Sequence, residues 1–402
     1  MIAAIRQPVL PPTVIHPPYP KTARQAEFIA LGQRAGEIAA QHAQRHDREG
    51  TFPHETFAAL RDEGFLKLTL PEEFGGLGAD PIETLLALEQ LARGDGAVGL
   101  GTTMHLVHVA GLADSRHWPE PLLQRFFSDV SEHGALINGI ASEPDLGSPS
   151  RGGQFATTAT RDGNGWRLNG RKTWSTLSPA LSYATVLLTV VEPDGERHPG
   201  QFLLPMDTPG VRVEGTWDNL SLRASGSNDV VLEDVWLPDE YQLPRPKGKP
   251  ASQISRWGLS TSAVYLGIGV AARDFAVQFA RDRVPSGLGT PIAELQTVQH
   301  RIAQIELLLL QARTLLYQTV ETFLASPPEV RQDLGWQFAA AKYTVTNNVI
   351  AVTDQALRVT GSAGQQRRFP LERYFRDARA GLGNPPMDDV ALTTIGKHAL
   401  GL

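Results

Sequence analysis

The sequence predicts an α+β fold, with helical segments at both ends of the chain and a block of strands between them. Two patterns lead to this prediction. Apolar residues recur at helical spacing in the first and last thirds, whereas the middle third alternates short apolar runs with Asn-Gly turn signals. The length of 402 residues is enough for two or three domains, each with a substantial core.

The first third begins with a proline-rich stretch, residues 1–22, which we expect to form an arm. A helical domain over residues 23–130 follows, and its start is dominated by Ala, Gln, Glu and Arg, all good helix formers. The turn cluster PEEFGGLG lies within this domain, and Asp80-Pro81 then marks the start of a helix that reaches Gly94.

The middle third, residues 131–245, reads as a small β-barrel or sandwich. The pairs Asn164-Gly165 and Asn169-Gly170 are tight-turn signals between alternating segments. Residues 184–191 and 228–238 are apolar enough to be buried strands, and Pro238 closes the second of them.

The last third, residues 246–402, reads as a bundle of long antiparallel helices, beginning with the segment 257–281. Two apolar stripes at helical spacing support this reading. The first stripe consists of Ile292, Leu295, Val298, Ile302, Ile305, Leu308 and Leu309, and the second of Phe338, Ala341, Val345, Val349, Val352, Ala356 and Val359.

The composition argues against several classes of function. Acidic residues (43) outnumber Lys plus Arg (37), and the net charge of −6 argues against a nucleic-acid partner. The chain has no cysteine, which excludes disulfides, thiolate metal sites and cysteine nucleophiles, and we expect no metal site. The first residues contain too much proline for a signal peptide, and no run reaches the ~18 apolar residues of a membrane span. We therefore expect a soluble cytoplasmic protein.

Seven segments, in order along the chain, resemble the acyl-CoA dehydrogenase superfamily of flavoproteins, and the resemblance covers nearly everything after residue 22. LPEEFGGLG (70–78) and LEQLARGDGAVG (88–99) are similar to the family's first signature and to the helix after it. The other five segments are ASEPDLGS (141–148), NGRKTWST (169–176), LRASGSNDVVLEDVWLP (222–238), LGTPIAELQTVQ (288–299) and RVTGSAGQQRRFPLERYFRDAR (358–379).

The resemblance implies a helical domain, a β-barrel and a four-helix bundle, assembled as a homotetramer or homodimer. It also implies a bound FAD, with FMN as the alternative, and a small-molecule substrate. The implied redox partner is an electron-transfer flavoprotein or a flavin reductase.

By the same resemblance, four residues would meet the flavin ring. Ala141 and Ser142 would donate hydrogen bonds to its pyrimidine end, Trp174 would lie near the ring, and Thr176 would bond to N5 or O4. Ser148 would meet a flavin phosphate. Without the resemblance, Trp174 would be read as a core aromatic residue and the two serines as turn residues.

The far end of the cofactor fits the family pattern less closely. Pro285 stands where the family has a phosphate-binding arginine, so Arg283 is the nearest candidate. Gln296 and Gly361 match their positions, whereas Ser362 replaces a glycine and Arg358 replaces a glutamine. Arg283 is otherwise a solvated charge at a helix end.

The usual catalytic base is missing. The family places a glutamate at one of two positions, which here are Pro385 and Ser255, the residue before Arg256. Removing a proton from carbon requires such a positioned base. Asp388 could replace the glutamate, although an aspartate also suits the start of a helix. His105 is the second possible replacement, although a histidine on a helix is usually a packing residue.

The resemblance implies, as the first reading, a flavin-dependent oxidoreductase of acyl-CoA dehydrogenase type that acts on the CH–CH group of an acyl-CoA or similar substrate. Two alternatives remain open. Two-component flavin monooxygenases of the same superfamily use reduced flavin and O₂, form a flavin C4a-hydroperoxide and need no base for carbon. In that reaction Asn384 would hydrogen-bond a peroxide oxygen, although Asn384 also suits a plain turn before Pro385. The second alternative is a catalytically silent flavoprotein that keeps the fold without the chemistry.

Overall fold

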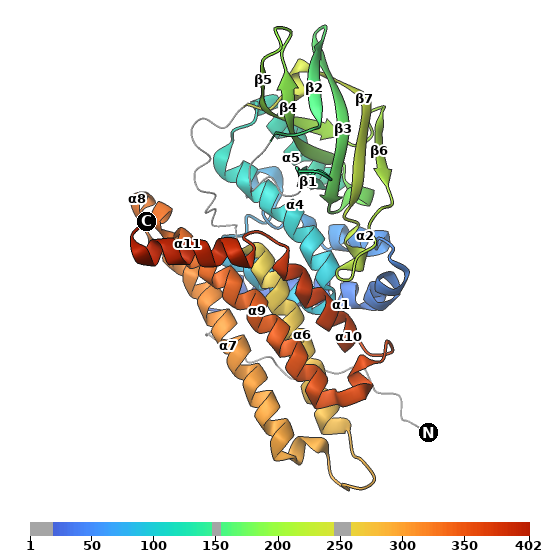
Figure 1. The fold of residues 1–402 in the computed structure, drawn as a ribbon, viewed down its shortest axis with the longest axis vertical. Helices are drawn as coiled ribbons and strands as arrows, with labels where there is room; N and C mark the ends of the chain where they lie inside the picture. The colour runs from blue at the N-terminus through green and yellow to red at the C-terminus, as the bar shows by residue number, and fades with distance from the viewer. Residues whose placement is uncertain (1–18, 147–153, 245–258) are drawn as a thin grey trace.

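The computed structural model describes residues 19–146, 154–244 and 259–402, and it shows a sheet at one end of an elongated molecule and a helical bundle at the other (Figure 1). The helices of the first third are α1 (Ala23–Glu49), α2 (His54–Asp62), α3 (Pro81–Gly94), α4 (Gly96–Ser115) and α5 (Glu120–His133). The predicted helix after Asp80 is confirmed as α3. Asp80 and Glu83 form a reciprocal capping box at its start, which fixes where the helix begins. The boundary expected at residue 130 falls inside the last turn of α5.

Seven strands form one half-barrel sheet in the middle of the chain. They are β1 (Ile137–Ile140), β2 (Thr158–Asp162), β3 (Gly165–Ser175), β4 (Tyr183–Val191), β5 (Arg197–Pro205), β6 (Val211–Glu214) and β7 (Asn228–Pro238). The order is β1-β4-β2-β3-β7-β6, with β5 antiparallel to β4. The strands β1 and β2 pair in parallel with the first and second halves of β4. The predicted strands 184–191 and 228–238 are therefore confirmed.

One of the two Asn-Gly pairs does not make the expected turn. Asn164-Gly165 lies at the hairpin between β2 and β3, as predicted. Asn169-Gly170 instead lies inside β3, at a shift in register against β7. Gly170 has φ +149°, and a Cβ placed on it would lie 2.6 Å from the Cα of Thr157. The glycine therefore permits close approach of two strands at an irregular point in the ladder.

The last third forms the predicted bundle (Figure 1). Its helices are α6 (Ser260–Asp282), α7 (Gln296–Ala325), α8 (Pro328–Arg331), α9 (Gly335–Thr360), α10 (Leu371–Asp377) and α11 (Asp388–Leu400), and the single-turn helix η10 (Ala378–Leu382) follows α10. Every residue of the second predicted stripe is buried on α9. The first stripe is only partly correct. Helix α7 begins at Gln296, and two residues of the stripe, Ile292 and Leu295, precede it.

Helix α4 joins the two ends of the molecule. Leu100 and Leu106 contribute to the core of the helical part, whereas Val109 and Leu112 pack in the core beneath the sheet. By length and composition α4 and α6 could cross a membrane, but both are mostly buried inside the protein. Buried core helices of large proteins have the same all-round apolar character.

Candidate active site

Trp174 on strand β3 is the most unusual residue of the sheet. Its side chain is 63% exposed, and its backbone has φ +56°, in the left-handed region that costs an ordinary residue roughly 1–2 kcal/mol. The irregular pairing between Lys172 and Ser175 produces this conformation, and the Thr176 N–H bonds back to the Trp174 carbonyl at 2.9 Å. A large apolar ring held outward at the expense of backbone strain indicates a binding surface.

A second tryptophan supports the first. The ring of Trp217 lies edge-to-face against Trp174, with centroids 5.1 Å apart. Its indole Nε1 donates to the carbonyl of Leu222 at 3.1 Å, and its backbone N–H donates to Asn228 Oδ1 at 3.0 Å. No motif points to Trp217, since it lies in an irregular segment between β6 and β7.

Thr176 has a hydroxyl that is already part of a buried row. Its Oγ1 lies 2.9 Å from Ser227 Oγ, which lies 2.8 Å from Ser225 Oγ. The amide of Asn138 donates to the Thr176 carbonyl at 2.9 Å and ties β1 to this segment. The row fixes the Thr176 side chain close to Trp174 on the same strand end.

The segment of Ala141 and Ser142 is anchored by a buried ion pair. Lys172 Nζ lies 2.6 Å from Glu143 Oε1, and both side chains are almost fully buried. Burial by itself would raise the pKa of Glu143, but hydrogen bonds from Lys172 and from the backbone N–H of Thr157 hold it below its usual range. Burial lowers the pKa of Lys172 against the pull of Glu143.

The same segment is also tied directly to the strand that carries Trp174. The carbonyl of Ser142 accepts the N–H of Thr173 at 2.9 Å. Ala141 and Ser142 are half-buried, and they therefore lie next to the strained end of β3.

The bundle contributes Asn384, which lies on the loop between η10 and α11. Its Nδ2 donates to the hydroxyl of Tyr265 on α6 at 2.7 Å. Tyr265 is fully buried, and burial raises the pKa of its hydroxyl further above neutrality. Lys342 Nζ donates to the carbonyl of Gly381 at 2.8 Å and holds the start of the same loop.

Asp377 connects the sheet with the bundle. Its Oδ1 accepts the N–H of Leu222 at 2.7 Å, and Leu222 is also the residue whose carbonyl holds Trp217. Burial raises the pKa of Asp377 to about 7, against the opposing effect of Arg373. The negative charge of Asp377 also helps to raise the pKa of Tyr265. Trp217 and Asp377 are therefore linked through the backbone of Leu222.

The structure does not leave His105 available for catalysis. Its Nε2 lies 2.8 Å from the carbonyl of Leu66, and its Nδ1 accepts the N–H of Ile137 at 3.3 Å. Burial lowers its pKa to about 4, so it is neutral at physiological pH. One ring nitrogen therefore joins α4 to the turn at Leu66 and the other joins it to β1, and the expected catalytic role is replaced by a structural one.

Asp388 lies in the first turn of α11, where a carboxylate favours the helix dipole. The N-cap residue is Met387, which makes no side-chain cap. Asp388 Oδ2 accepts from Asn347 Nδ2 at 3.1 Å, while its Oδ1 is buried with no hydrogen-bond partner in the described part of the chain. The carboxylate is therefore directed towards α9 and does not cap the start of α11.

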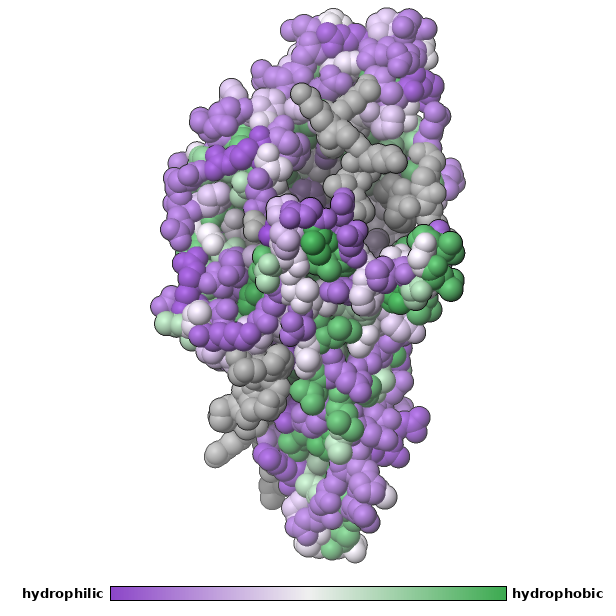
Figure 2. Space-filling view, turned by 90° about the vertical axis from the view of Figure 1, so that its left-hand side faces the viewer, coloured by the Kyte–Doolittle hydropathy of each residue, from purple (hydrophilic) through white to green (hydrophobic). Residues whose placement is uncertain are grey.

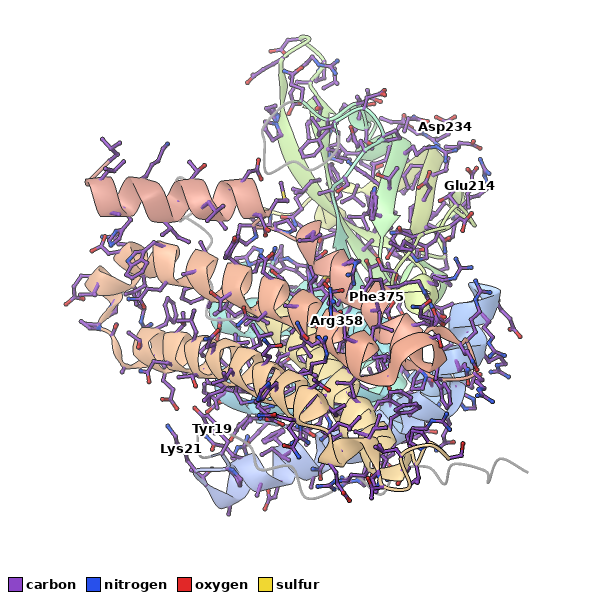
Figure 3. The ribbon with its side chains drawn as sticks, turned by 60° about the horizontal axis from the view of Figure 1, so that its bottom comes forward. Tyr19, Lys21, Glu214, Asp234, Arg358 and Phe375 are labelled. Atoms are coloured by element: carbon purple, nitrogen blue, oxygen red, sulfur yellow. The ribbon has the colours of Figure 1, made fainter. Side chains whose placement is uncertain are left out.

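The residues expected at the far end of the cofactor are all exposed and all lie on the bundle. Arg358 lies in the last turn of α9 and is visible in Figure 3 with Phe375 of α10. Arg283 ends α6, Gln296 begins α7, and Gly361 and Ser362 follow α9, with Gly361 at φ +59°. Two expected site residues, Ser148 and Arg256, lie outside the described residues.

In the same described part of the chain, no group of three or more His, Asp or Glu side chains is arranged to hold a metal ion.

Comparison with known proteins agrees with this architecture. Family models match in three successive parts: the acyl-CoA dehydrogenase N-terminal domain over residues 32–114, the middle domain over 139–235 and the C-terminal domain over 253–396. YdbM of Bacillus subtilis (strain 168) is 39% identical over 376 residues, covering 94% of this chain and 97% of YdbM.

Two solved structures superpose over nearly the whole chain. KijD3 in complex with FMN and a dTDP-amino-keto-sugar has a TM-score of 0.83 at 27% identity, with 95% of each chain covered. Butyryl-CoA dehydrogenase from Megasphaera elsdenii has a TM-score of 0.83 at 25% identity, with 94% of this chain and 98% of that chain covered. From the three family models and the relative at 39% identity, we conclude that the chain belongs to the acyl-CoA dehydrogenase family of flavoproteins.

Proposed function

We propose that the flavin ring binds against Trp174 and Thr176, between the sheet and the bundle. The strained, exposed Trp174 carries this proposal, because the irregular end of β3 and the ring of Trp217 hold a large apolar side chain at the surface. Ala141 and Ser142 would face the pyrimidine end of the ring. The flavin supplies two-electron redox chemistry, and the protein orients it and sets its electrostatic surroundings.

We further propose FAD rather than FMN as the resident cofactor. Exposed polar groups on the bundle would bind its distal phosphates. The candidates are Arg283, Gln296, Arg358, Gly361, Ser362 and Ser148. FMN lacks the second phosphate and the adenosine of FAD, so it would leave the bundle residues without a ligand. KijD3, which binds FMN, is the counterexample within the fold.

For the reaction, the proposal is oxygenation of a small substrate by reduced flavin and O₂. Pro385 stands where a carboxylate would remove a proton from carbon, His105 is engaged by backbone groups, and Asp388 is bonded to Asn347. Asn384 lies next to Pro385 and offers hydrogen bonds without acid or base chemistry. A reaction that begins with O₂ does not need a base that removes a proton from carbon. Its redox partner would be a flavin reductase.

The second candidate is dehydrogenation of an acyl-CoA at its CH–CH bond. The similarity to butyryl-CoA dehydrogenase favours it. In this reaction Asp388 would have to turn towards the substrate and act as the base, and Arg256 is the further catalytic candidate. The electrons would then pass to an electron-transfer flavoprotein.

The proposed setting is a cytoplasmic homotetramer or homodimer. Leu307 and Leu310 on α7 are 58% and 47% exposed in the single chain. Figure 2 shows hydrophobic residues running along one face of the bundle, whereas the upper part of the same view is mostly hydrophilic. An apolar stripe of this kind on a helical surface is the usual sign of a subunit interface.

The test compares the wild-type protein with Trp174→Ala, and Trp236→Ala serves as an exposed tryptophan control on β7. We expect Trp174→Ala to weaken flavin binding at least about tenfold. Its folding stability should change little, because the exposed side chain loses only the edge-to-face contact with Trp217. Trp236→Ala should bind flavin normally. Equal flavin affinity in all three proteins would overturn the proposed location.

The reaction type is tested with two measurements on the flavin-loaded protein. In the first, a panel of acyl-CoAs is added without oxygen, and the visible absorbance of the flavin is followed. Bleaching by any acyl-CoA would establish the dehydrogenase. In the second, reduced flavin is mixed with O₂, and slow reoxidation through a distinct absorbance band would support the oxygenase. A protein that binds flavin in neither redox state would be the silent member of the family.

A further inference from the structure

The Tyr265–Asn384 contact is the one described polar contact that joins the buried face of α6 to the loop where the family has its base. Tyr265 is among the largest fully buried side chains of the protein. Its hydroxyl lies 2.7 Å from Asn384 Nδ2, and this is the hydrogen bond that each side chain makes within the described residues. A buried hydroxyl is costly to leave unpaired, so this bond holds the amide in one orientation.

That orientation decides which atom of Asn384 is free. A neutral amide has two N–H donors on its nitrogen and an acceptor on its oxygen. Because the nitrogen faces Tyr265, the Oδ1 atom lies on the other side of the half-buried side chain. Asn384 therefore offers an acceptor to whatever lies beside it.

The loop itself is held on both sides of Asn384. On one side, Lys342 Nζ donates to the carbonyl of Gly381 at 2.8 Å. On the other side, Asn347 Nδ2 donates to Asp388 Oδ2 at 3.1 Å. Both of these donors come from α9, while Tyr265 comes from α6. The backbone is therefore fixed independently of Tyr265, and the role left to Tyr265 is to set the amide.

We propose that Tyr265 is a positioning residue that keeps the Oδ1 atom of Asn384 free, and that this oxygen binds a hydrogen-bond donor of the substrate, an N–H or O–H group. The proposal rests on the proposed function, because it takes Asn384 to face the substrate beside the flavin. The proposal also narrows the substrate class. The substrate would be a small molecule that carries an N–H or O–H group where a substrate of other family members meets the catalytic carboxylate.

The test uses two probes of nearly the same flat shape. Indole carries an N–H donor, whereas benzothiophene has sulfur in its place. Dissociation constants of both are measured on the flavin-loaded protein from the perturbation of the flavin absorbance. The quantity of interest is the benzothiophene constant divided by the indole constant, since this ratio cancels the shared apolar contribution.

The variants are Tyr265→Phe, Asn384→Leu and the double variant, with Tyr317→Phe as the control. Tyr317 is also fully buried, and its hydroxyl bonds to Glu89 at 2.9 Å on another part of the bundle. We expect the ratio to fall about five- to tenfold in Tyr265→Phe, the size of one neutral hydrogen bond. Asn384→Leu should lower it equally, the double variant should lower it no further, and Tyr317→Phe should leave it at the wild-type value.

Three outcomes would overturn the proposal. The ratio could stay unchanged in Tyr265→Phe but fall in Asn384→Leu, which would show that Tyr265 has no role in recognising the N–H group. It could rise in Tyr265→Phe, which would mean that the amide nitrogen faces the substrate. It could also stay constant in every variant, which would place Asn384 away from the bound ring.

Failure of the proposed function is recognised separately. If Trp174→Ala binds flavin as well as the wild type, the flavin lies elsewhere, whatever the probes show. Crystal structures of the wild type and Tyr265→Phe then report the amide directly, without flavin or probe. An Asn384 side chain with the same position and the same hydrogen-bond partners for its Nδ2 and Oδ1 atoms in both structures would overturn the positioning role.

Discussion

At the level of single residues, Asp377 shows how the site depends on burial. Its carboxyl accepts the N–H of Leu222, lies near Arg373 and shares its surroundings with the acidic side chains of Asp47 and Asp95. Burial and the two acidic neighbours raise its pKa to about 7, and Arg373 opposes this effect. The folded protein therefore keeps a proton on Asp377 at pH values where the unfolded chain has lost it.

The first prediction concerns this proton. Because the folded-state pKa is raised, the stability that Asp377 contributes is fully present near pH 4 and is lost as the pH rises to about 7. Asp377→Asn mimics the protonated form, so its stability should not show this loss. Urea midpoints of both proteins should diverge as the pH rises from about 4 to about 7, with the wild type falling, and should run parallel at higher pH.

Asp354→Asn is the matched control for Asp377→Asn, because Asp354 is a half-exposed carboxyl paired with Arg379. Its urea midpoints should run parallel to those of the wild type. Parallel curves for Asp377→Asn as well would show that Asp377 is ionised throughout this range.

At the level of the secondary-structure element, β3 combines a buried anchor with an exposed functional end. Lys172 points inward to Glu143, whereas Trp174, two residues later, is exposed. Residues two apart lie on the same face of a regular strand, so alternation alone would not separate these two side chains. The irregular pairing between Lys172 and Ser175 then turns Trp174 into the left-handed region.

The second prediction tests the anchor. Lys172→Met leaves the Glu143 carboxylate buried with only the backbone N–H groups of Ala156 and Thr157 as partners. Breaking a buried pair in this way should cost about 3–5 kcal/mol in urea unfolding. Flavin affinity should fall as well, since Ala141 and Ser142 lose their support.

The control for Lys172→Met lies on the same strand. Arg167 pairs with Asp162 at 2.7 Å, and both side chains are more than 40% exposed. Arg167→Met should cost less than ~1 kcal/mol, because exposed pairs contribute little. If the two variants lowered the free energy of unfolding by similar amounts, the Glu143–Lys172 pair would have no special role.

At the level of the whole molecule, Arg376 joins three parts of the fold. It bonds to both carboxylate oxygens of Asp47 at the end of α1, at 3.0 and 2.6 Å, and to Glu372 on its own helix. It also donates to the carbonyl of Leu220, which belongs to the segment that carries Trp217. The first helix, the sheet and the bundle therefore meet at one guanidinium group.

The third prediction follows from this junction. Arg376→Met should destabilise the protein by about 1–3 kcal/mol, because several charge-assisted hydrogen bonds are lost. Hydrogen–deuterium exchange should become faster in residues 45–50 and 216–224, which lie far apart in the sequence. Arg379→Met is the control, since Arg379 contacts Asp354 and Phe375 within the bundle alone. If exchange rises only in α10, Arg376 does not connect the three parts.

Much of the fold could be predicted from the sequence, because local patterns decide it. The capping box at Asp80, the buried stripe of α9 and the apolar strand 184–191 are encoded in neighbouring residues. The candidate flavin residues Trp174 and Thr176 could be named from their motif. Asn169-Gly170 could not be placed correctly, because the approach of Thr157 that requires Gly170 comes from another strand.

Residue patterns alone predict the class of the fold, the order of its parts and the lack of a carboxylate at position 385. Periodicity, turn residues and residue identity are properties of short stretches of chain, and they can be read without knowing what lies nearby in space. Other features appear only in the folded structure: His105 is bound by the backbone, Tyr265 holds Asn384, Trp217 packs against Trp174, and Asp377 bonds to Leu222. These outcomes depend on burial and on partners more than 30 residues away in the chain, and only the folded arrangement brings those groups together.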